Sequence, residues 1–225
     1  MSVQHGSTPS PYLEWRAAEV GAPSRATAAA KRIFDVVTSG GLLLVGGPVW
    51  IGLAAYVKCT SRGPVFFGQT RLGKRGVPFR LYKFRTMCPE AEAMLDASPL
   101  LRARHRDGGY KLPDADDSRI TPAGRVLRRC GLDEVPQLFN VLRGEMSLVG
   151  PRPIVPDEAA RYREFPSVVQ FVRPGITGPW QLRDTESCDY HERATIDRRY
   201  AERLSLSTDL MILLRTLRRI ARIGR

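Results

Sequence analysis

The sequence predicts an α/β protein rich in helix, in which a bent apolar helix and several amphipathic helices accompany a short pair of strands. Three observations predict it. From Val36 to Val57, 22 residues pass without Asp, Glu, Lys or Arg. Residues 63–87 combine short apolar and aromatic runs with Gly and Pro, and leucines recur at helical spacing from Asp209 onward. This pattern favours one small folded unit that rests on a membrane helix.

The composition limits the class of protein. The 225 residues suffice for one domain with a core, alone or with appendages. Lys and Arg total 35 against 23 Asp and Glu, a net charge of +12. We therefore expect anionic partners: nucleic acid, an acidic membrane surface or phosphorylated substrates. The four cysteines form no Cys-x-x-Cys pair and the three histidines complete no zinc spacing, which argues against a disulfide scaffold.

The chain divides into three expected parts. Residues 1–30 lack apolar periodicity and have no signal-peptide layout, so we expect a disordered tail. Residues 31–60 form the expected membrane helix, and residues 61–225 the folded unit. Its last helix, from Asp209, gathers leucines on one face and arginines on another, as in helices that lie in a membrane interface. An ordinary core helix with a solvated outer face is the alternative.

The uncharged segment is long enough to cross a bilayer. A straight helix of this length would reach about 33 Å, roughly the hydrocarbon thickness. Gly47 and Pro48 lie near its middle and predict a break, because proline removes a helical hydrogen bond and clashes with the preceding turn. Basic residues flank both ends, which favours a re-entrant helix over a spanning one, with a buried core helix third. Asp35 is expected to cap this helix, with an ion pair to Lys31 or Arg32 as the alternative.

Local signals predict the remaining elements. Residues 63–87 read as two strands with the turn at Gly73–Gly76. One row of their cations could hold phosphate, although such charges taken alone more commonly belong to a solvated strand edge. Residues 89–106 and 161–172 are predicted helices, and residues 173–181 a loop. Thr121 and Pro122 predict a helix start. The acidic run at 114–117 indicates a cation site or, more commonly, a loop with a cap.

Two adjacent carboxylates, Asp133 and Glu134, stand out in this basic chain, just ahead of Pro136. Taken alone they indicate the first turn of a helix, where acidic residues and proline are both favoured. The surrounding motifs shift that interpretation toward a reaction centre.

The chain resembles the bacterial sugar transferases, the monotopic polyprenol-phosphate phosphoglycosyl transferases. The resembling motifs, in order, are Lys31–Asp35, Gly68–Gly73, Lys83–Met87, Asp133–Leu142, Met146–Pro153 and Arg173–Gly178. They cover the chain from about Lys31 to Leu217.

The resemblance implies an enzyme that transfers a sugar 1-phosphate from a UDP-sugar to a polyprenol phosphate and releases UMP. It implies a small α/β catalytic unit on a re-entrant helix with interface helices, at the cytoplasmic face of the bacterial inner membrane. It also implies a magnesium ion. The acidic dyad of the family falls on Asp133 and Glu134, and its Pro-Arg-Pro motif on Pro151, Arg152 and Pro153.

Physical chemistry is consistent with those roles. We expect Asp133 to act as nucleophile on the sugar-bearing phosphorus, and Glu134 either to place magnesium or to remove a proton. Asp133 and Glu134 are thus the candidate metal ligands. Arg152 is the candidate bidentate phosphate clamp, with Arg85 and Arg129 as weaker candidates. Expected partners are the nucleotide-diphosphate sugar, polyprenol phosphate and membrane lipids, with a homodimer also compatible and no nucleic acid.

Two departures from the family pattern stand out. Gly47 precedes the helix-breaking Pro48 where relatives often have serine, and Asp184-Thr185 stands where many relatives have Gly-Arg. The competing hypotheses are a basic nucleic-acid-binding protein and a membrane-surface adaptor without catalysis. The first explains neither the uncharged segment nor the acidic pair, and salt-sensitive DNA binding by a detergent-free soluble protein would support it.

Overall fold

The computed structural model describes residues 23–107, 112–114, 116–158, 172–182 and 190–223. The predicted tail up to residue 22 and, apart from Val172, the predicted helix at 161–172 lie outside these residues. The chain is a mixed, helix-rich α/β structure, as predicted. In chain order its elements are α1 (Arg25–Val45), α2 (Gly47–Thr60), β1 (Phe66–Leu72), η1 (Lys74–Gly76), β2 (Pro78–Phe84), α3 (Ala91–Ala97), α4 (Pro99–Asp107), α5 (Pro122–Arg129), η2 (Leu132–Glu134), α6 (Gln137–Arg143), β3 (Ser147–Val149), β4 (Gly175–Thr177), η4 (Trp180–Leu182), α8 (Tyr190–Glu202) and α9 (Leu206–Ile223), where η marks a 3₁₀ helix.

Helix α1 begins at Arg25, ahead of the predicted boundary at Lys31. The side chain of Ser24 caps it by accepting a hydrogen bond from the Thr27 amide at 3.1 Å. The alanine-rich residues 26–30 have high helix propensity, which explains why the predicted tail is too long at this end.

The predicted break at Gly47 and Pro48 is confirmed. Helices α1 and α2 meet at Gly46 and are bent by 67°. Trp50 folds back across the break, where its indole Nε1 donates to the Leu42 carbonyl at 3.0 Å. A Cβ on Gly46 would lie 2.3 Å from the Trp50 ring, so only glycine fits there.

Pro48→Ala is expected to reduce the 67° bend. Alanine restores an N–H donor for the preceding turn and removes the clash of the proline ring. The distance between two spin labels, one on a cysteine introduced in place of Ile33 and one on Cys59, would then lengthen. The other cysteines are replaced by serine, and pulsed electron resonance measures the distance. Gly52→Ala is the matched control, since its Cβ would meet nothing within 4 Å. An unchanged distance in the Pro48 variant would contradict this explanation of the break.

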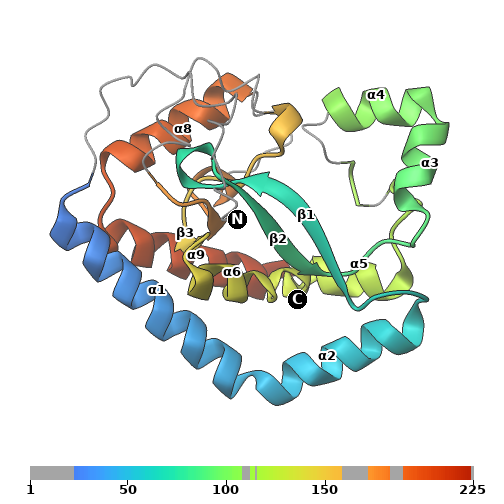
Figure 1. The fold of residues 1–225 in the computed structure, drawn as a ribbon, viewed down its shortest axis with the longest axis horizontal. Helices are drawn as coiled ribbons and strands as arrows, with labels where there is room; N and C mark the ends of the chain where they lie inside the picture. The colour runs from blue at the N-terminus through green and yellow to red at the C-terminus, as the bar shows by residue number, and fades with distance from the viewer. Residues whose placement is uncertain (1–22, 108–111, 115, 159–171, 183–189, 224–225) are drawn as a thin grey trace, which may run out of the picture.

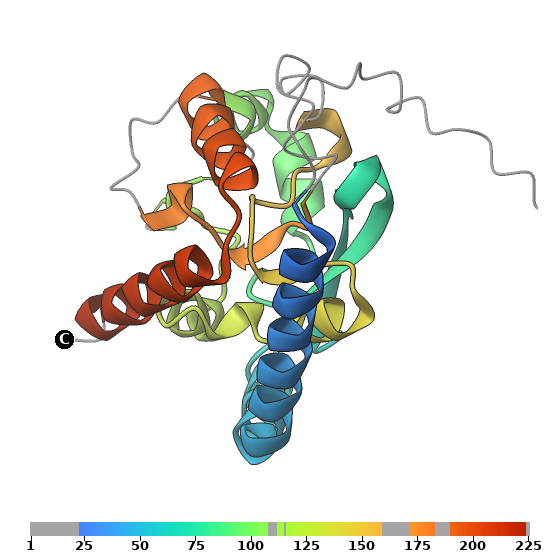
Figure 2. The same ribbon diagram turned by 90° about the vertical axis from the view of Figure 1, so that its left-hand side faces the viewer.

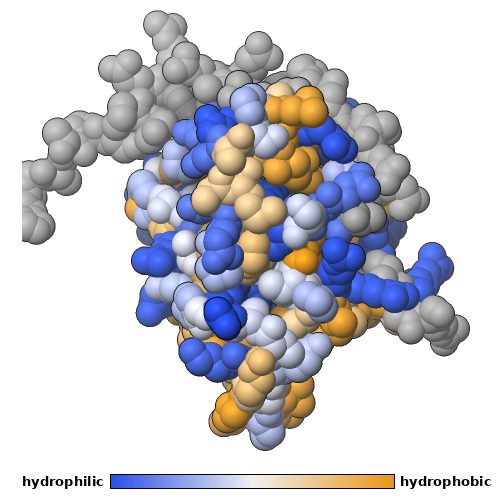
Figure 3. Space-filling model, turned by 90° about the vertical axis from the view of Figure 1, so that its right-hand side faces the viewer, coloured by the Kyte–Doolittle hydropathy of each residue, from blue (hydrophilic) through white to orange (hydrophobic). Residues whose placement is uncertain are grey.

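No single helix in the described part of the chain is both long and apolar enough to cross a membrane, but α1 and α2 together pass that test of length and composition. In Figures 1 and 2 this pair extends below the rest of the molecule, whereas α8 lies on the opposite side. Hydrophobic residues cover much of the protruding lower end in Figure 3. Leu44 and Val45, at the end of α1, are each 82% exposed.

The predicted hairpin is also confirmed. Strands β1 and β2 pair antiparallel around the η1 turn, with Gln69 opposite Leu81 and Arg71 opposite Phe79. Paired residues share a face of a sheet, so these two β1 side chains lie on the same face as Lys83. Phe79 and Leu81 on that face are buried in the main core, which also includes Leu138, Val141, Met146, Leu148, Val149, Tyr200 and Ile212.

Residues 173–181 were predicted as a loop, and the structure corrects this. Gly175–Thr177 form β4, a strand parallel to β3, and Trp180–Leu182 form the 3₁₀ helix η4. The strand is short and glycine-rich, so its composition resembles that of a loop. A Cβ on Gly150 would lie 2.3 Å from the Arg173 carbonyl oxygen, so glycine permits the close approach of the two backbones.

Two further predictions are revised and one is confirmed. The single helix at 89–106 is two, α3 and α4, which meet at Ser98-Pro99.

Asp35 is no helix cap: it is 1% exposed and accepts hydrogen bonds from Ser147 Oγ at 3.1 Å and the Leu148 amide at 3.0 Å. Thr121 does cap α5, with its hydroxyl accepting from the Gly124 amide at 3.0 Å.

The acidic run at 114–117 forms ion pairs. Asp117 pairs with Arg119 and Asp114 with Arg128, both at 2.8–2.9 Å. No group of three or more potential metal ligands occurs among the described residues. The C-terminal helix, α9, is confirmed as amphipathic, with exposed leucines that include Leu217 at 63%.

Candidate active site

The acidic pair lies on η2, a short 3₁₀ helix between α5 and α6. Gly131 turns the chain into it with a left-handed φ of 66°. Asp133 is only 6% exposed, whereas Glu134 is half-buried. The pair therefore begins a short helix, as its composition suggested, while one of its carboxylates is withdrawn from water.

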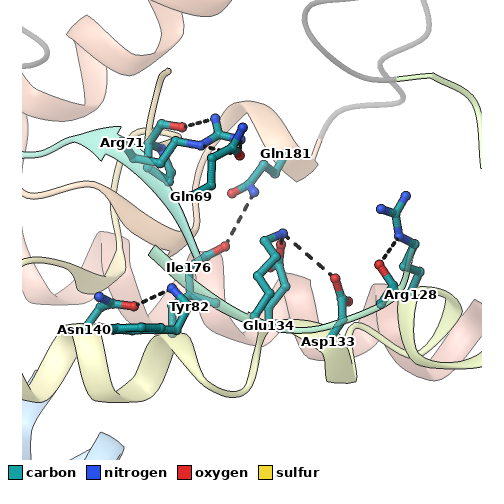
Figure 4. Close-up of polar contacts among 12 residues, drawn as sticks. Gln69, Arg71, Tyr82, Arg128, Asp133, Glu134, Asn140, Ile176 and Gln181 are labelled. Carbon is teal, nitrogen blue, oxygen red and sulfur yellow. Dashed lines mark hydrogen bonds and ion pairs between the residues drawn. The ribbon is translucent and has the colours of Figure 1, made fainter. Parts of the chain in front are cut away.

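Both carboxylates converge on one cation from the hairpin. Lys83 Nζ lies 2.6 Å from Glu134 Oε1 and 3.9 Å from Asp133 Oδ2. In Figure 4, Asp133 and Glu134 lie in the lower part of the view, and Gln69, Arg71 and Gln181 lie in the upper part. Residues of the hairpin, η2 and η4 thus face one region.

The pKa of Asp133 is raised above its usual value, chiefly because burial penalises the charged form. Lys83 acts in the opposite direction and is the strongest influence favouring ionisation, while Glu134 raises the pKa further. Partial desolvation makes a carboxylate a stronger nucleophile than it is in bulk water, and the adjacent cations favour its ionised form.

Lys83→Met is expected to shift the acid limb of the activity profile to higher pH. Lys83 lowers the pKa of Asp133, so its loss raises a pKa that burial has already raised, and the ionised carboxylate is then lost at higher pH. The profile of kcat/KM for UMP release between about pH 5 and 9 measures the shift. Lys74→Met, on the turn of the same hairpin, serves as control. Superimposable profiles for Lys83→Met and wild type would contradict this role.

A further cation, Arg128 on α5, lies beside Asp133. It favours the charged form of Asp133 and lowers its pKa. Its guanidinium is fixed by hydrogen bonds from Nε to Thr86 Oγ1 and from Nη1 to Asp114 Oδ1, both at 2.9 Å. Arg128 is thereby preorganised next to the carboxylate.

The Pro151–Pro153 turn follows β3 and lies at the other side of the region. The Arg152 guanidinium lies over the Trp180 ring, 5.8 Å from its centroid. The Arg152 backbone hydrogen-bonds to the buried Asp197. Arg71 Nη1 donates to the Pro153 carbonyl at 2.8 Å, which ties the turn to β1. The turn that carries Arg152, the predicted phosphate clamp, is therefore held both by Asp197 and by Arg71.

Magnesium was predicted on Asp133 and Glu134, and the donor set fits it. The two carboxylates lie close to one another, and the ammonium of Lys83 lies 2.6 Å from Glu134 and 3.9 Å from Asp133. Magnesium is commonly bound by one or two carboxylates together with substrate phosphates. Two protein carboxylates are thus a sufficient set when a diphosphate supplies further oxygens.

Comparison with known proteins identifies the family. A family model described as bacterial sugar transferase matches residues 26–222. The chain belongs to this family. It is therefore an enzyme of the transferase class, as predicted.

Several curated relatives of this bacterial sugar transferase carry specific names. One is the undecaprenyl-phosphate galactose phosphotransferase of Salmonella typhimurium, 40% identical over 85% of the chain and 40% of the relative. Another is the exopolysaccharide production protein ExoY of Rhizobium meliloti, 39% identical over 88% of each. A third is the UDP-glucose:undecaprenyl-phosphate glucose-1-phosphate transferase of Caulobacter vibrioides, 38% identical over 83% of the chain and 67% of the relative. The chain spans less than half of the Salmonella protein.

Of the two weaker arginine candidates of this sugar transferase, one is buried against the residue that follows α2 and the other is exposed. Arg85 is 6% exposed, and its Nη2 donates to the Ser61 carbonyl at 2.8 Å and to Ser61 Oγ at 2.7 Å. Its guanidinium thus stabilises the connection between α2 and β1. Arg129 is exposed at the last residue of α5.

Sequence reasoning did not single out Lys83, Arg128 or Arg71 in this sugar transferase. Arg128 and Arg129 are adjacent in sequence and differ in the direction in which α5 points their side chains. A helical projection anchored on the buried Leu127 could have identified the inward arginine. Alternation along β2 places Lys83 and Arg80 on opposite faces, but it does not show which face meets the acidic pair.

Proposed function

We propose that this protein transfers a sugar 1-phosphate from a UDP-sugar to a polyprenol phosphate, such as undecaprenyl phosphate, and releases UMP. The observation that carries the proposal is the buried Asp133 carboxylate, next to Glu134 and set between Lys83 and Arg128. The Salmonella and Caulobacter relatives are named for the same class of acceptor. The reaction would be the first membrane step of a glycan such as an exopolysaccharide.

Two displacements at phosphorus account for the reaction. The Asp133 carboxylate attacks the phosphorus that bears the sugar, and the bond from that phosphorus to the oxygen of UMP breaks, which leaves an aspartyl phosphosugar. The phosphate of the polyprenol then attacks the same phosphorus and the Asp133 carboxylate leaves. This acceptor needs little base, because a phosphate monoester is largely ionised near neutral pH, with a second pKa of about 6.

The surrounding residues hold charge and orientation. Arg128 and Arg152 neutralise phosphate oxygens, and Lys83 keeps the Asp133 pKa lower than burial alone would. Glu134 either joins Asp133 in holding magnesium or removes the last acceptor proton. Magnesium, when bound, supplies positive charge that offsets the repulsion between carboxylate and diphosphate.

The acceptor suggests where the protein works. A polyprenol phosphate is confined to a membrane, and the bent pair α1 and α2 with its exposed Leu44 and Val45 would insert into one leaflet. The exposed leucines of α9 would lie in the same interface, with arginines near lipid phosphates. We therefore propose the cytoplasmic face of the inner membrane, with a re-entrant helix.

Purified protein supplied with undecaprenyl phosphate, magnesium and UDP-glucose or UDP-galactose tests the function. We expect continued UMP release only with the lipid acceptor, and a transient mass increase of one phosphosugar on the protein. A boiled sample and a reaction without lipid are the controls. No UMP release across a panel of UDP-sugars would contradict the proposal.

A further inference from the structure

Arg71, on β1, is held in one orientation before any substrate arrives. Its Nε and Nη2 donate to Gln69 Oε1 at 3.2 and 2.7 Å, and its Nη1 donates to the Pro153 carbonyl at 2.8 Å. Leu72, the next residue, adds a backbone hydrogen bond to Ile154 at 2.9 Å. The side chain of Arg71 is therefore preorganised against the turn that carries Arg152.

These contacts leave donor capacity unused. A guanidinium carries five N–H donors, and the three contacts account for one on each nitrogen. One N–H on Nη1 and one on Nη2 remain, and this pair of atoms is the fork that matches two phosphate oxygens.

The charged groups that influence Arg71 place it between the Pro-Arg-Pro turn and the acidic pair. Its pKa is lowered to about 10, first by burial and next by Arg152, while Glu158 and Glu134 act in the opposite direction. Arg71 therefore lies close to both the Pro-Arg-Pro turn and the acidic pair. Two neighbouring guanidinium groups repel one another, and an anion that bridges them removes that repulsion.

We propose that Arg71 and Arg152 together form the subsite for the diphosphate of the nucleotide donor, with Arg71 as a direct ligand of a phosphate oxygen. This rests on the proposed function and adds a residue to it. In Figure 4, Arg71 lies in the same part of the view as Gln181, above Glu134. Gln69 has the positioning role, because its one oxygen fixes two nitrogens of the guanidinium.

Calorimetric binding of UDP and uridine to the full chain in detergent with magnesium tests this subsite. Arg71→Gln should weaken UDP binding about tenfold or more, as expected for a lost charge-assisted hydrogen bond, and leave uridine binding unchanged. Arg71→Lys should give an intermediate loss, because an ammonium cannot contact Gln69, Pro153 and phosphate together. Arg80→Gln is the matched control, since Arg80 is an exposed arginine on the opposite face of the same hairpin.

Unchanged UDP affinity in Arg71→Gln would overturn the subsite, and so would equal losses for UDP and uridine, which indicate only a disturbed turn. If Arg71→Gln does not fold, the ratio of UDP to uridine affinity in Arg71→Lys decides, and an unchanged ratio overturns the proposal. UMP release is measured on the same wild-type samples. Turnover together with unchanged UDP affinity in the variants defeats the subsite alone, whereas a wild type that neither binds UDP nor releases UMP defeats the proposed function as well.

Discussion

Asp133→Asn is expected to lower kcat for UMP release by roughly 10³-fold or more, because loss of a nucleophile has effects of this size. The amide has nearly the same shape as the carboxylate but carries no negative charge to attack phosphorus. The aspartyl phosphosugar should vanish from the mass spectrum of the protein at the same time. Measurement of UMP in a coupled assay gives the rate, and Glu134→Gln provides the comparison within the pair.

The same substitution should leave the fold intact or make it more stable. Burial raises the pKa of Asp133, so ionising this group costs more in the folded than in the unfolded chain. This destabilisation is present at pH values above the pKa of Asp133 in the folded chain. It disappears as the pH falls through that pKa, because protonated Asp133 carries no charge that burial penalises. Near pH 7.5 the neutral Asn therefore removes an unfavourable charge, and Tm should equal or exceed that of wild type. Full turnover by a folded Asp133→Asn variant would refute the nucleophile assignment.

Elements with local signals were predictable from the sequence. The break at Gly47 and Pro48, the turn of the hairpin and the cap at Thr121 each depend on a few neighbouring residues whose stereochemistry is restrictive. The structure confirms all three. The acidic pair was identifiable because it interrupts a basic chain next to motifs of a known family.

Features that depend on distant partners were not predictable. Asp35 looked like a cap, but its partner Ser147 is 112 residues away. Lys83 and Glu134 are separated by 51 residues, and nothing in either local stretch reveals the ion pair. Arg85 was chosen from its motif, yet a motif does not show that the side chain turns toward Ser61.

The attachment of α1 to the catalytic unit is such a distant feature. Lys31 Nζ donates to the Val149 carbonyl at 2.9 Å and to the Asp209 carboxylate, and the side chains are 11% and 1% exposed. The Tyr200 hydroxyl lies 2.6 Å from Asp209 Oδ1. One lysine thus joins α1 to β3 and α9 within a buried network.

Lys31→Met is expected to destabilise the fold by about 3–5 kcal/mol, because removal of one partner leaves a buried charge uncompensated. For a chain of this size that corresponds to a fall in Tm of about 10 °C. Lys58→Met, an exposed lysine on α2, is the matched control and should change Tm little.

The pH dependence separates lost charge pairing from lost packing. Burial already raises the pKa of Asp209, Lys31 is the largest influence that lowers it, and Asp35 raises it further. In Lys31→Met the pKa rises again, so the destabilisation is full above this pKa and shrinks as falling pH protonates Asp209. Thermal unfolding followed from about pH 8 to 5 should show the Tm deficit narrowing toward acid. A deficit that stays constant over this range would indicate a packing defect, and α1 would then be held by its apolar contacts rather than by its buried lysine.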